Sequence, residues 1–252
     1  MWLGPRFTQD SIRLRREALR QGWSVERVTG WAAREARGGD AASAVVYAET
    51  LVAHAIAERL GGVLEDVADD WLARCPGWAL GRSVRAMELE EARRLEGEWF
   101  IKPASEKWFQ AGVFAGGVAL PEVDGLDEAD PVLVSGVVRF ASEFRCFVRD
   151  GEVRAASVYA RWGEACGGDE EGWPCEEDEL SAARAFCARA LEASPRLPRG
   201  VVVDVGRLDG GEWALVEANP VWGAGVYGCA ASGVLEALEV GGVLGIGVED
   251  RD

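Results

Sequence analysis

Two apolar segments near the C-terminus, joined by a short turn, most constrain the fold of this chain. Residues 201–208 read Val-Val-Val-Asp-Val-Gly-Arg-Leu, residues 212–220 read Glu-Trp-Ala-Leu-Val-Glu-Ala-Asn-Pro, and Asp-Gly-Gly lies between them. Apolar, β-branched runs on both sides of a glycine-containing turn are typical of an antiparallel hairpin. With the two glycines as the turn, Asp204 lies opposite Glu217, and a turn that differs by one residue moves this pairing by one.

Two carboxylates so placed form a candidate metal site. Side chains on a strand alternate with a period of two, so Asn219 shares the face of Glu217. Like charges on neighbouring strands repel and are costly to bury unless a positive charge lies between them. Mg²⁺ prefers such oxygen ligands, and we therefore predict Asp204, Glu217 and Asn219 as its ligands. Neutralising either carboxylate should then hold or raise the stability of the metal-free protein. The alternative is that the carboxylates pair with arginines such as Arg145 or Arg207.

Lysine is almost absent from the chain. The only two, Lys102 and Lys107, lie five positions apart in Phe-Ile-Lys-Pro-Ala-Ser-Glu-Lys, and every other basic side chain except His54 is an arginine. An ammonium is a compact point charge, whereas a guanidinium is a planar fork. Lysines kept in one short apolar segment therefore indicate contact with phosphate. The alternative is that two solvated lysines remain by chance.

Composition excludes several functional classes. The formal net charge of −16 disfavours nucleic acid and anionic membranes as partners. No apolar stretch is long enough to span a bilayer, and residues 1–6 lack a signal-peptide pattern, so we expect a cytoplasmic protein. The six cysteines form no Cys-x-x-Cys pair and there is one histidine. Zinc sites and His-dependent nucleophiles are therefore disfavoured.

The order of elements in the first third of the chain predicts an α/β lobe, a small open sheet with helices on its faces. Before the Pro76-Gly77 pair, strands and helices alternate, with strands at 23–28 and 44–47 and helices at 9–21, capped by Thr8 or Asp10, and at 49–60. After it, the pattern predicts a helix at 88–95, strands at 99–102 and 132–134, a hairpin of 144–149 with 152–159 around Asp150-Gly151, and a helix at 177–193.

These residues, in this order, resemble the ATP-grasp superfamily, and most closely its branch named for one arginine and two lysines. The resemblance runs from Phe-Ile-Lys-Pro at 100–103 through Val-Leu-Val-Ser at 132–135 and Glu-Phe-Arg at 143–145. It ends at Asp204 and the Glu-Ala-Asn-Pro of 217–220.

The resemblance implies an ATP-grasp fold, in which two α+β lobes clasp ATP. It divides the chain into a preceding N-terminal α/β lobe at 1–77 and an ATP-grasp domain at 78–252. Within that domain, the small lobe would cover about 78–134 and the large lobe about 135–252.

The implied activity is an ATP- and Mg²⁺-dependent carboxylate–amine ligase that forms an amide or peptide bond through an acyl-phosphate. Its substrates would be small-molecule or peptide carboxylates and amines, and a homo-oligomer is possible. A kinase-type phosphotransferase in the same cleft and a non-catalytic nucleotide-binding module remain as alternatives.

The resemblance also implies roles for individual residues. Lys102, Lys107, Val134, Ser135 and Glu143 would bind the nucleotide, with adenine against the hinge at 134–135. Asp204, Glu217 and Asn219 would hold magnesium, and Arg145, Lys107 and Arg161 would act in catalysis. The segment 105–112 departs from the family, because it replaces the usual Gly-rich phosphate lid.

Overall fold

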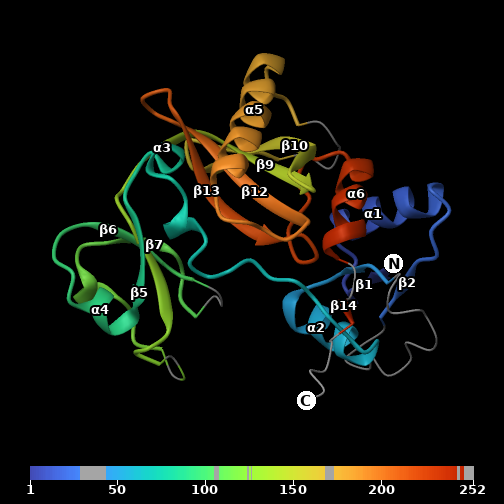
Figure 1. The fold of residues 1–252 in the computed structure, drawn as a ribbon, viewed down its shortest axis with the longest axis horizontal. Coiled ribbons are helices and arrows are strands. Elements are labelled where there is room, and N and C mark those ends of the chain that lie inside the picture. Colours follow the sequence, from blue (N-terminus) through green and yellow to red (C-terminus); the bar gives the residue numbers. More distant parts are fainter. Residues whose placement is uncertain are drawn as a thin grey trace.

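The computed structural model describes residues 1–28, 44–104, 108–123, 125, 127–167, 173–242 and 245–246. A large five-stranded sheet lies between a small four-stranded sheet on one side and the N-terminal helices on the other (Figure 1). The chain builds the N-terminal elements first, then the small sheet, then the large sheet, and returns to the N-terminal elements at its end.

The N-terminal elements form a short parallel sheet with two helices. Its strands are β1 (Trp2–Leu3), β2 (Glu26–Arg27) and β3 (Val46–Tyr47), in the order β2-β1-β3. Helix α1 covers Gln9–Arg20 and α2 covers Thr50–Arg59. The Thr8 hydroxyl accepts a hydrogen bond from the Ser11 backbone N–H at 3.1 Å, which confirms Thr8 as the N-cap. Both predicted helices are present, and the strands are shorter than predicted.

The small sheet is wholly antiparallel, in the order β5-β8-β6-β7. Its strands are β5 (Val84–Glu88), β6 (Trp99–Pro103), β7 (Gly112–Phe114) and β8 (Pro131–Ser135), and α4 (Leu89–Arg93) packs on it. Ile101, Val132 and Val134 face a core shared with Leu89 of α4. Because strand side chains alternate, Lys102 points to the opposite face.

The large sheet is antiparallel, in the order β11-β10-β9-β12-β13. The strands are β9 (Phe140–Arg149), β10 (Glu152–Arg161), β11 (Glu164–Ala165), β12 (Gly200–Leu208) and β13 (Trp213–Pro220). Asp150 and Gly151 join β9 to β10 with φ of 51° and 83°. Two consecutive positive φ values define the primed hairpin turn that the Asp-Gly pair predicts.

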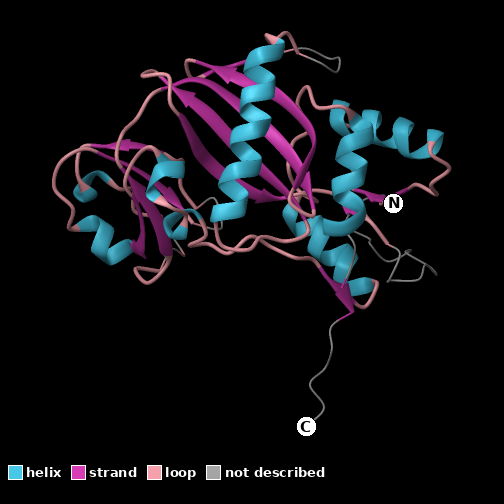
Figure 2. Ribbon diagram, turned by 45° about the horizontal axis from the view of Figure 1, so that its top comes forward, coloured by secondary structure: helices cyan, strands magenta, loops and turns pink. Residues whose placement is uncertain are grey.

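Helices cover both faces of the large sheet (Figure 2). Helix α5 (Glu177–Ala193), predicted at 177–193, packs its Phe186 and Cys187 with Val203 of β12. On the other face, α6 (Ala231–Gly241) shares a core with Phe147, Val202 and the N-terminal elements. The N-terminal elements and the large sheet are therefore joined by one continuous core.

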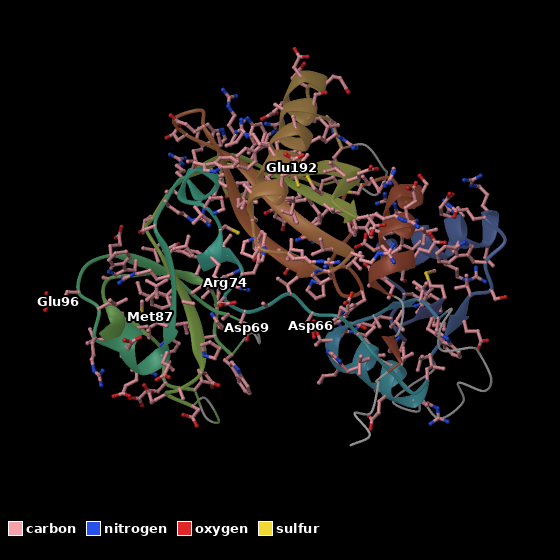
Figure 3. All side chains as sticks on the ribbon, in the orientation of Figure 1. Asp66, Asp69, Arg74, Met87, Glu96 and Glu192 are labelled. Atoms are coloured by element: carbon pink, nitrogen blue, oxygen red, sulfur yellow. The ribbon has the colours of Figure 1, made fainter. Side chains whose placement is uncertain are left out.

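The chain passes from α2 to the small sheet through a segment that packs on the large sheet. Asp66, Asp69 and Arg74 mark this path in Figure 3. It continues through a short 3₁₀ turn (Leu72–Arg74) and α3 (Gly77–Leu80), and the Trp71 indole N–H donates to the Pro195 carbonyl at 2.9 Å. The domain division at residue 77 falls inside this packed segment and stays a prediction.

Two further observations apply to the described part of the chain. No helix in it is long and apolar enough to cross a membrane. All six cysteines are free there, including Cys166 and Cys175.

Candidate nucleotide-binding site

The register of the β12–β13 hairpin sets the position of the two carboxylates. Asp204 pairs with Glu217, as predicted, but by a different route. The turn is one residue longer than a two-glycine turn, because the Leu208 N–H donates to the Glu212 carbonyl at 2.7 Å. The register then shifts between Asp204 and Val205, which leaves Val216 as the extra residue of a β-bulge. The bulge restores the pairing that the longer turn had moved by one.

Glu217 and Asp204 belong to a row of four side chains across the large sheet. Asp204 on β12 pairs with Glu217 on β13 and with Arg145 on β9, and Arg145 pairs with Ser157 on β10. Residues directly opposite one another on neighbouring strands project to the same face. The row therefore carries one positive and two negative charges on the face opposite α5.

Asp204 and Arg145 form a buried, bidentate ion pair. Arg145 donates from Nε to Oδ1 at 2.9 Å and from Nη2 to Oδ2 at 2.7 Å, and its Nη1 donates to the Gly225 carbonyl at 3.0 Å. The Asp204 side chain is 0% exposed and that of Arg145 is 8% exposed. Burial opposes the charge of Arg145, but the Asp204 carboxylate holds the arginine pKa above its ordinary value. Arg145 is therefore permanently cationic.

Two stacked tyrosines lie beside the Arg145 guanidinium. Its carbon lies 4.6 Å from the Tyr227 ring centre and 5.6 Å from that of Tyr159, and the two rings stack. The Tyr159 hydroxyl donates to Glu143 at 2.8 Å. Burial, followed by the nearby carboxylates, raises the pKa of Tyr159, so this phenol stays neutral.

Glu217 has a cationic partner from the small sheet. The Lys102 ammonium of β6 lies 2.7 Å from Glu217 Oε2, and the Asn219 amide donates to Oε1 at 2.9 Å. Burial by itself would raise the pKa of Glu217, but the charge and hydrogen bond of Lys102 and the amide of Asn219 lower it to about 2. An ionised Glu217 thus links the two sheets through Lys102.

A cleft of about 270 Å³ lies between the small sheet and the large sheet, beside this pair. One wall comes from β5–β8 and the other from β9, β13 and the segment 136–138. The lining is apolar except for a few polar and charged side chains, which are Arg82, Lys102, Ser135, Glu143 and Glu217. Burial raises the pKa of Glu143 and lowers that of Arg82 to about 10, which leaves the arginine charged at neutral pH.

The structure brings most of the predicted site residues together. Lys102, Ser135, Glu143 and Glu217 line the cleft, and Asn219 and Asp204 lie beside Glu217. Two predicted residues point elsewhere, and one lies outside the described residues. The Val134 side chain lies in the core of the small lobe. Arg161 is held by Glu179 of α5 at 2.8 Å. Lys107 is the residue outside the described part.

The predicted magnesium ligands differ in how well they fit a metal. Glu217 lies in the cleft wall and already holds a cation, the Lys102 ammonium, and Asn219 offers an amide oxygen beside it. Both Asp204 oxygens are engaged by Arg145, which is the ion-pair alternative weighed from the sequence. Within the described residues, no group of three or more acidic, Cys or His side chains is arranged to hold a metal ion. The donors that fit Mg²⁺ are therefore Glu217 and Asn219.

Sequence reasoning missed Arg82 and the tyrosines around Arg145. Arg82 precedes β5 in a stretch that shows no clear strand periodicity, and nothing local marks it among the arginines. Tyr227 has a positive φ of 51°, which side-chain-bearing residues seldom adopt. The sequence carries no signal for that conformation.

Solved structures share this fold over nearly the whole chain. A RimK domain ATP-grasp protein from Sphaerobacter thermophilus is 15% identical with a TM-score of 0.50, and covers 96% of this chain and 97% of its own. The ATP-grasp ligase PsnB, complexed with a minimal precursor, Mg and ADP, is 15% identical with a TM-score of 0.51, over 94% and 96% of the two chains. D-cycloserine synthetase DcsG is 14% identical with a TM-score of 0.54, over 94% and 98%.

No curated protein matches the sequence. A family model does, over residues 80–237: the ATP-grasp domain in family 2 of the clade named for one arginine and two lysines. This match covers more than half of the chain and includes Lys102, Arg145, Asp204 and Glu217. The fold, the cleft between the two sheets and the family match agree, and this chain belongs to the ATP-grasp family, whose members are mostly ligases.

Proposed function

We propose that this protein is an ATP- and Mg²⁺-dependent carboxylate–amine ligase that works through an acyl-phosphate. The observation that carries the proposal is the Lys102–Glu217 pair in the wall of the cleft. The Lys102 ammonium, from the small sheet, is suited to bind phosphate, and the Glu217 carboxylate, from the large sheet, is suited to bind a metal ion. The apolar walls around Ser135 suit a purine ring, and the charged end suits the phosphates.

The proposed reaction has two steps. A carboxylate oxygen of the first substrate attacks the γ-phosphorus of ATP, the bond from that phosphorus to the β–γ bridging oxygen breaks, and ADP leaves. An amine nitrogen of the second substrate then attacks the acyl carbon, phosphate leaves, and the nitrogen loses a proton. Both steps depend on positioning and charge neutralisation. They require no nucleophilic side chain, which agrees with the single histidine of the chain.

Each cation has a place in this scheme. Lys102 would exchange Glu217 for a phosphate oxygen when the nucleotide binds. Mg²⁺, held by Glu217 and Asn219, would supply charge neutralisation at the phosphates. Arg145 is fixed by Asp204 and Gly225, and its charge would offset that of the transferred phosphoryl group. Lys107 would supply a second ammonium.

The test is product analysis. The protein is incubated with ATP, Mg²⁺ and a library of amino acids and peptides, and mass spectrometry identifies the products. A ligase releases ADP and phosphate and forms an amide, and hydroxylamine in place of the amine traps the acyl-phosphate as a hydroxamate. A protein carrying Glu217→Gln serves as the control and should form neither product.

The kinase-type alternative gives a different result. A phosphotransferase makes ADP and a stable phosphorylated product, with no free phosphate and no hydroxamate. A non-catalytic module would bind nucleotide and release no ADP with any member of the library. Either result contradicts the proposed ligase activity.

A further inference from the structure

A β-bulge aims Glu217 into the cleft. Trp213 and Leu215 of β13 pack in the core beneath α5. Strict alternation would place Glu217 on that same face. The extra residue at Val216 instead puts Ala218 against that core and turns Glu217 toward Asp204 on the other face. The orientation of the proposed metal ligand therefore depends on one irregular backbone position.

The side chain that holds this bulge comes from outside the hairpin. Arg82 donates from Nη1 to the carbonyls of Leu80 at 2.9 Å and Leu215 at 2.8 Å, and from Nη2 toward the Val216 carbonyl at 3.4 Å. These acceptors belong to the end of α3 and to the two bulge residues that precede Glu217. The guanidinium also lies 5.6 Å from the Phe140 ring centre.

The geometry points to Arg82 as a positioning residue that fixes the Val216 bulge and thereby orients Glu217 toward the bound metal. This inference rests on the proposed function. A planar fork with several fixed donors suits the role, because it meets carbonyls in different directions at once. Lysine could reach one or two of them but could not reproduce the fork. Arg82 also lines the cleft, so direct contact with the nucleotide is the competing explanation.

The two explanations differ in what they do to metal-dependent binding. Titration calorimetry measures ADP affinity with and without Mg²⁺ for the wild-type protein, Arg82→Ala and Arg82→Lys. The control is Arg85→Ala, because the guanidinium of Arg85 on β5 lies 5.1 Å from the ring centre of Trp99 on β6. If Arg82 acts through Glu217, its alanine variant should lose about tenfold or more of the affinity that Mg²⁺ adds, as for other residues that support metal ligands.

The ADP affinity measured without Mg²⁺ should stay near wild type in both Arg82 variants. Arg82→Lys should lose part of the increase in ADP affinity that Mg²⁺ causes, a smaller part than Arg82→Ala loses. Arg85→Ala should keep the whole increase. If Arg82→Ala loses ADP affinity equally with and without Mg²⁺, direct nucleotide contact explains the loss and the inference is overturned. If Mg²⁺ increases the ADP affinity of Arg82→Ala as much as that of wild type, the inference is also overturned. If Arg82→Ala does not fold, Arg82→Lys decides by the same comparison. A wild-type protein whose ADP affinity is indifferent to Mg²⁺ would count against the proposed function itself.

Discussion

Asp204 and Arg145 form an ion pair that is costly to break because both side chains are buried. Asp204→Asn leaves a buried guanidinium without its carboxylate, and we expect a loss of about 3–5 kcal/mol in the free energy of unfolding. This reverses the expectation from the sequence, in which the neighbouring carboxylates repelled each other. Asp204→Leu combined with Arg145→Met removes both charges and should cost much less than the sum of the single changes. Urea denaturation of wild type, Asp204→Asn, Asp204→Leu, Arg145→Met and the double variant measures this, and additive losses would contradict the pairing.

Glu217 should make the free energy of unfolding depend on pH in the acidic range. Its pKa is about 2 in the folded protein, below its ordinary value of 4.5, so it stabilises the fold above about pH 4.5 and loses this contribution as the pH falls toward 2. The difference in free energy of unfolding between wild type and Glu217→Gln should shrink by roughly 1–2 kcal/mol between pH 6 and pH 3, an amount already reduced for the partial exposure of the Glu217 side chain. Urea denaturation between pH 3 and 6, at about half-unit steps, measures it.

A matched variant isolates the cause of this pH dependence. In Lys102→Met the ammonium that lowers the pKa of Glu217 is gone while burial still raises this pKa, so the destabilisation caused by a further Glu217→Gln change should no longer shrink between pH 6 and pH 3. If the difference in free energy of unfolding between wild type and Glu217→Gln is constant from pH 6 to pH 3, the folded protein does not lower the pKa of Glu217.

The sequence predicted which residues share this site better than it predicted which of them pair with each other. Asp204, Glu217 and Asn219 lie on one short hairpin, so strand periodicity alone placed them together. Arg145 is 59 residues from Asp204, and it meets Asp204 because β9 lies next to β12 in the sheet. No local pattern gives that strand order. The Lys102–Glu217 contact spans 115 residues and depends on how the two sheets face each other.

At the scale of elements, α6 and β12 approach so closely that only glycine fits between them. A Cβ on Gly241 would lie 2.2 Å from the backbone oxygen of Gly200, and one on Gly200 would lie 2.2 Å from that of Ala237. Gly241→Ala must push the helix from the sheet, and overpacking of this kind costs about 1–3 kcal/mol. Gly167→Ala is the matched control, because a Cβ there meets nothing within 4 Å. Equal stabilities of the two variants in urea would show that the helix can shift without cost.

Elements with strong local signals were predicted well, and elements defined by packing were not. Helix α5 has an amphipathic stripe and an acidic first turn, and the prediction of 177–193 matches Glu177–Ala193. Helix α6 is buried on most sides and contains glycines, and its polar stripe is narrow, made by Ser232, Glu236 and Glu239; this helix was not predicted from the sequence. The Val216 bulge has no sequence signature, because a valine fits a regular strand equally well.

For the whole molecule, the question is how a chain of net charge −16 would bind the anionic nucleotide of the proposed reaction. The repulsion is offset locally, because Lys102 lines the cleft and the buried Arg145 lies behind it. The two sheets contribute separately to this site, and Lys102 joins them through Glu217. Bound nucleotide and Mg²⁺ should therefore stabilise the whole fold by mass action, since they hold both sheets at once.

A non-hydrolysable ATP analogue with Mg²⁺ at about 100 times its dissociation constant should add about 2.7 kcal/mol of stability. For a chain of this length that corresponds to a rise of roughly 5–10 °C in Tm. Lys102→Met should weaken binding of the analogue by about 1.5–3 kcal/mol, the scale of a charged hydrogen bond. At the same ligand concentration, the ligand-induced increase in the Tm of this variant should therefore be about half that of wild type or less. Arg199→Met, which removes an exposed cation paired with Asp150, should keep the full rise. Differential scanning fluorimetry measures all three. A rise that is equal in wild type and Lys102→Met would show that the nucleotide does not bind at the Lys102–Glu217 pair.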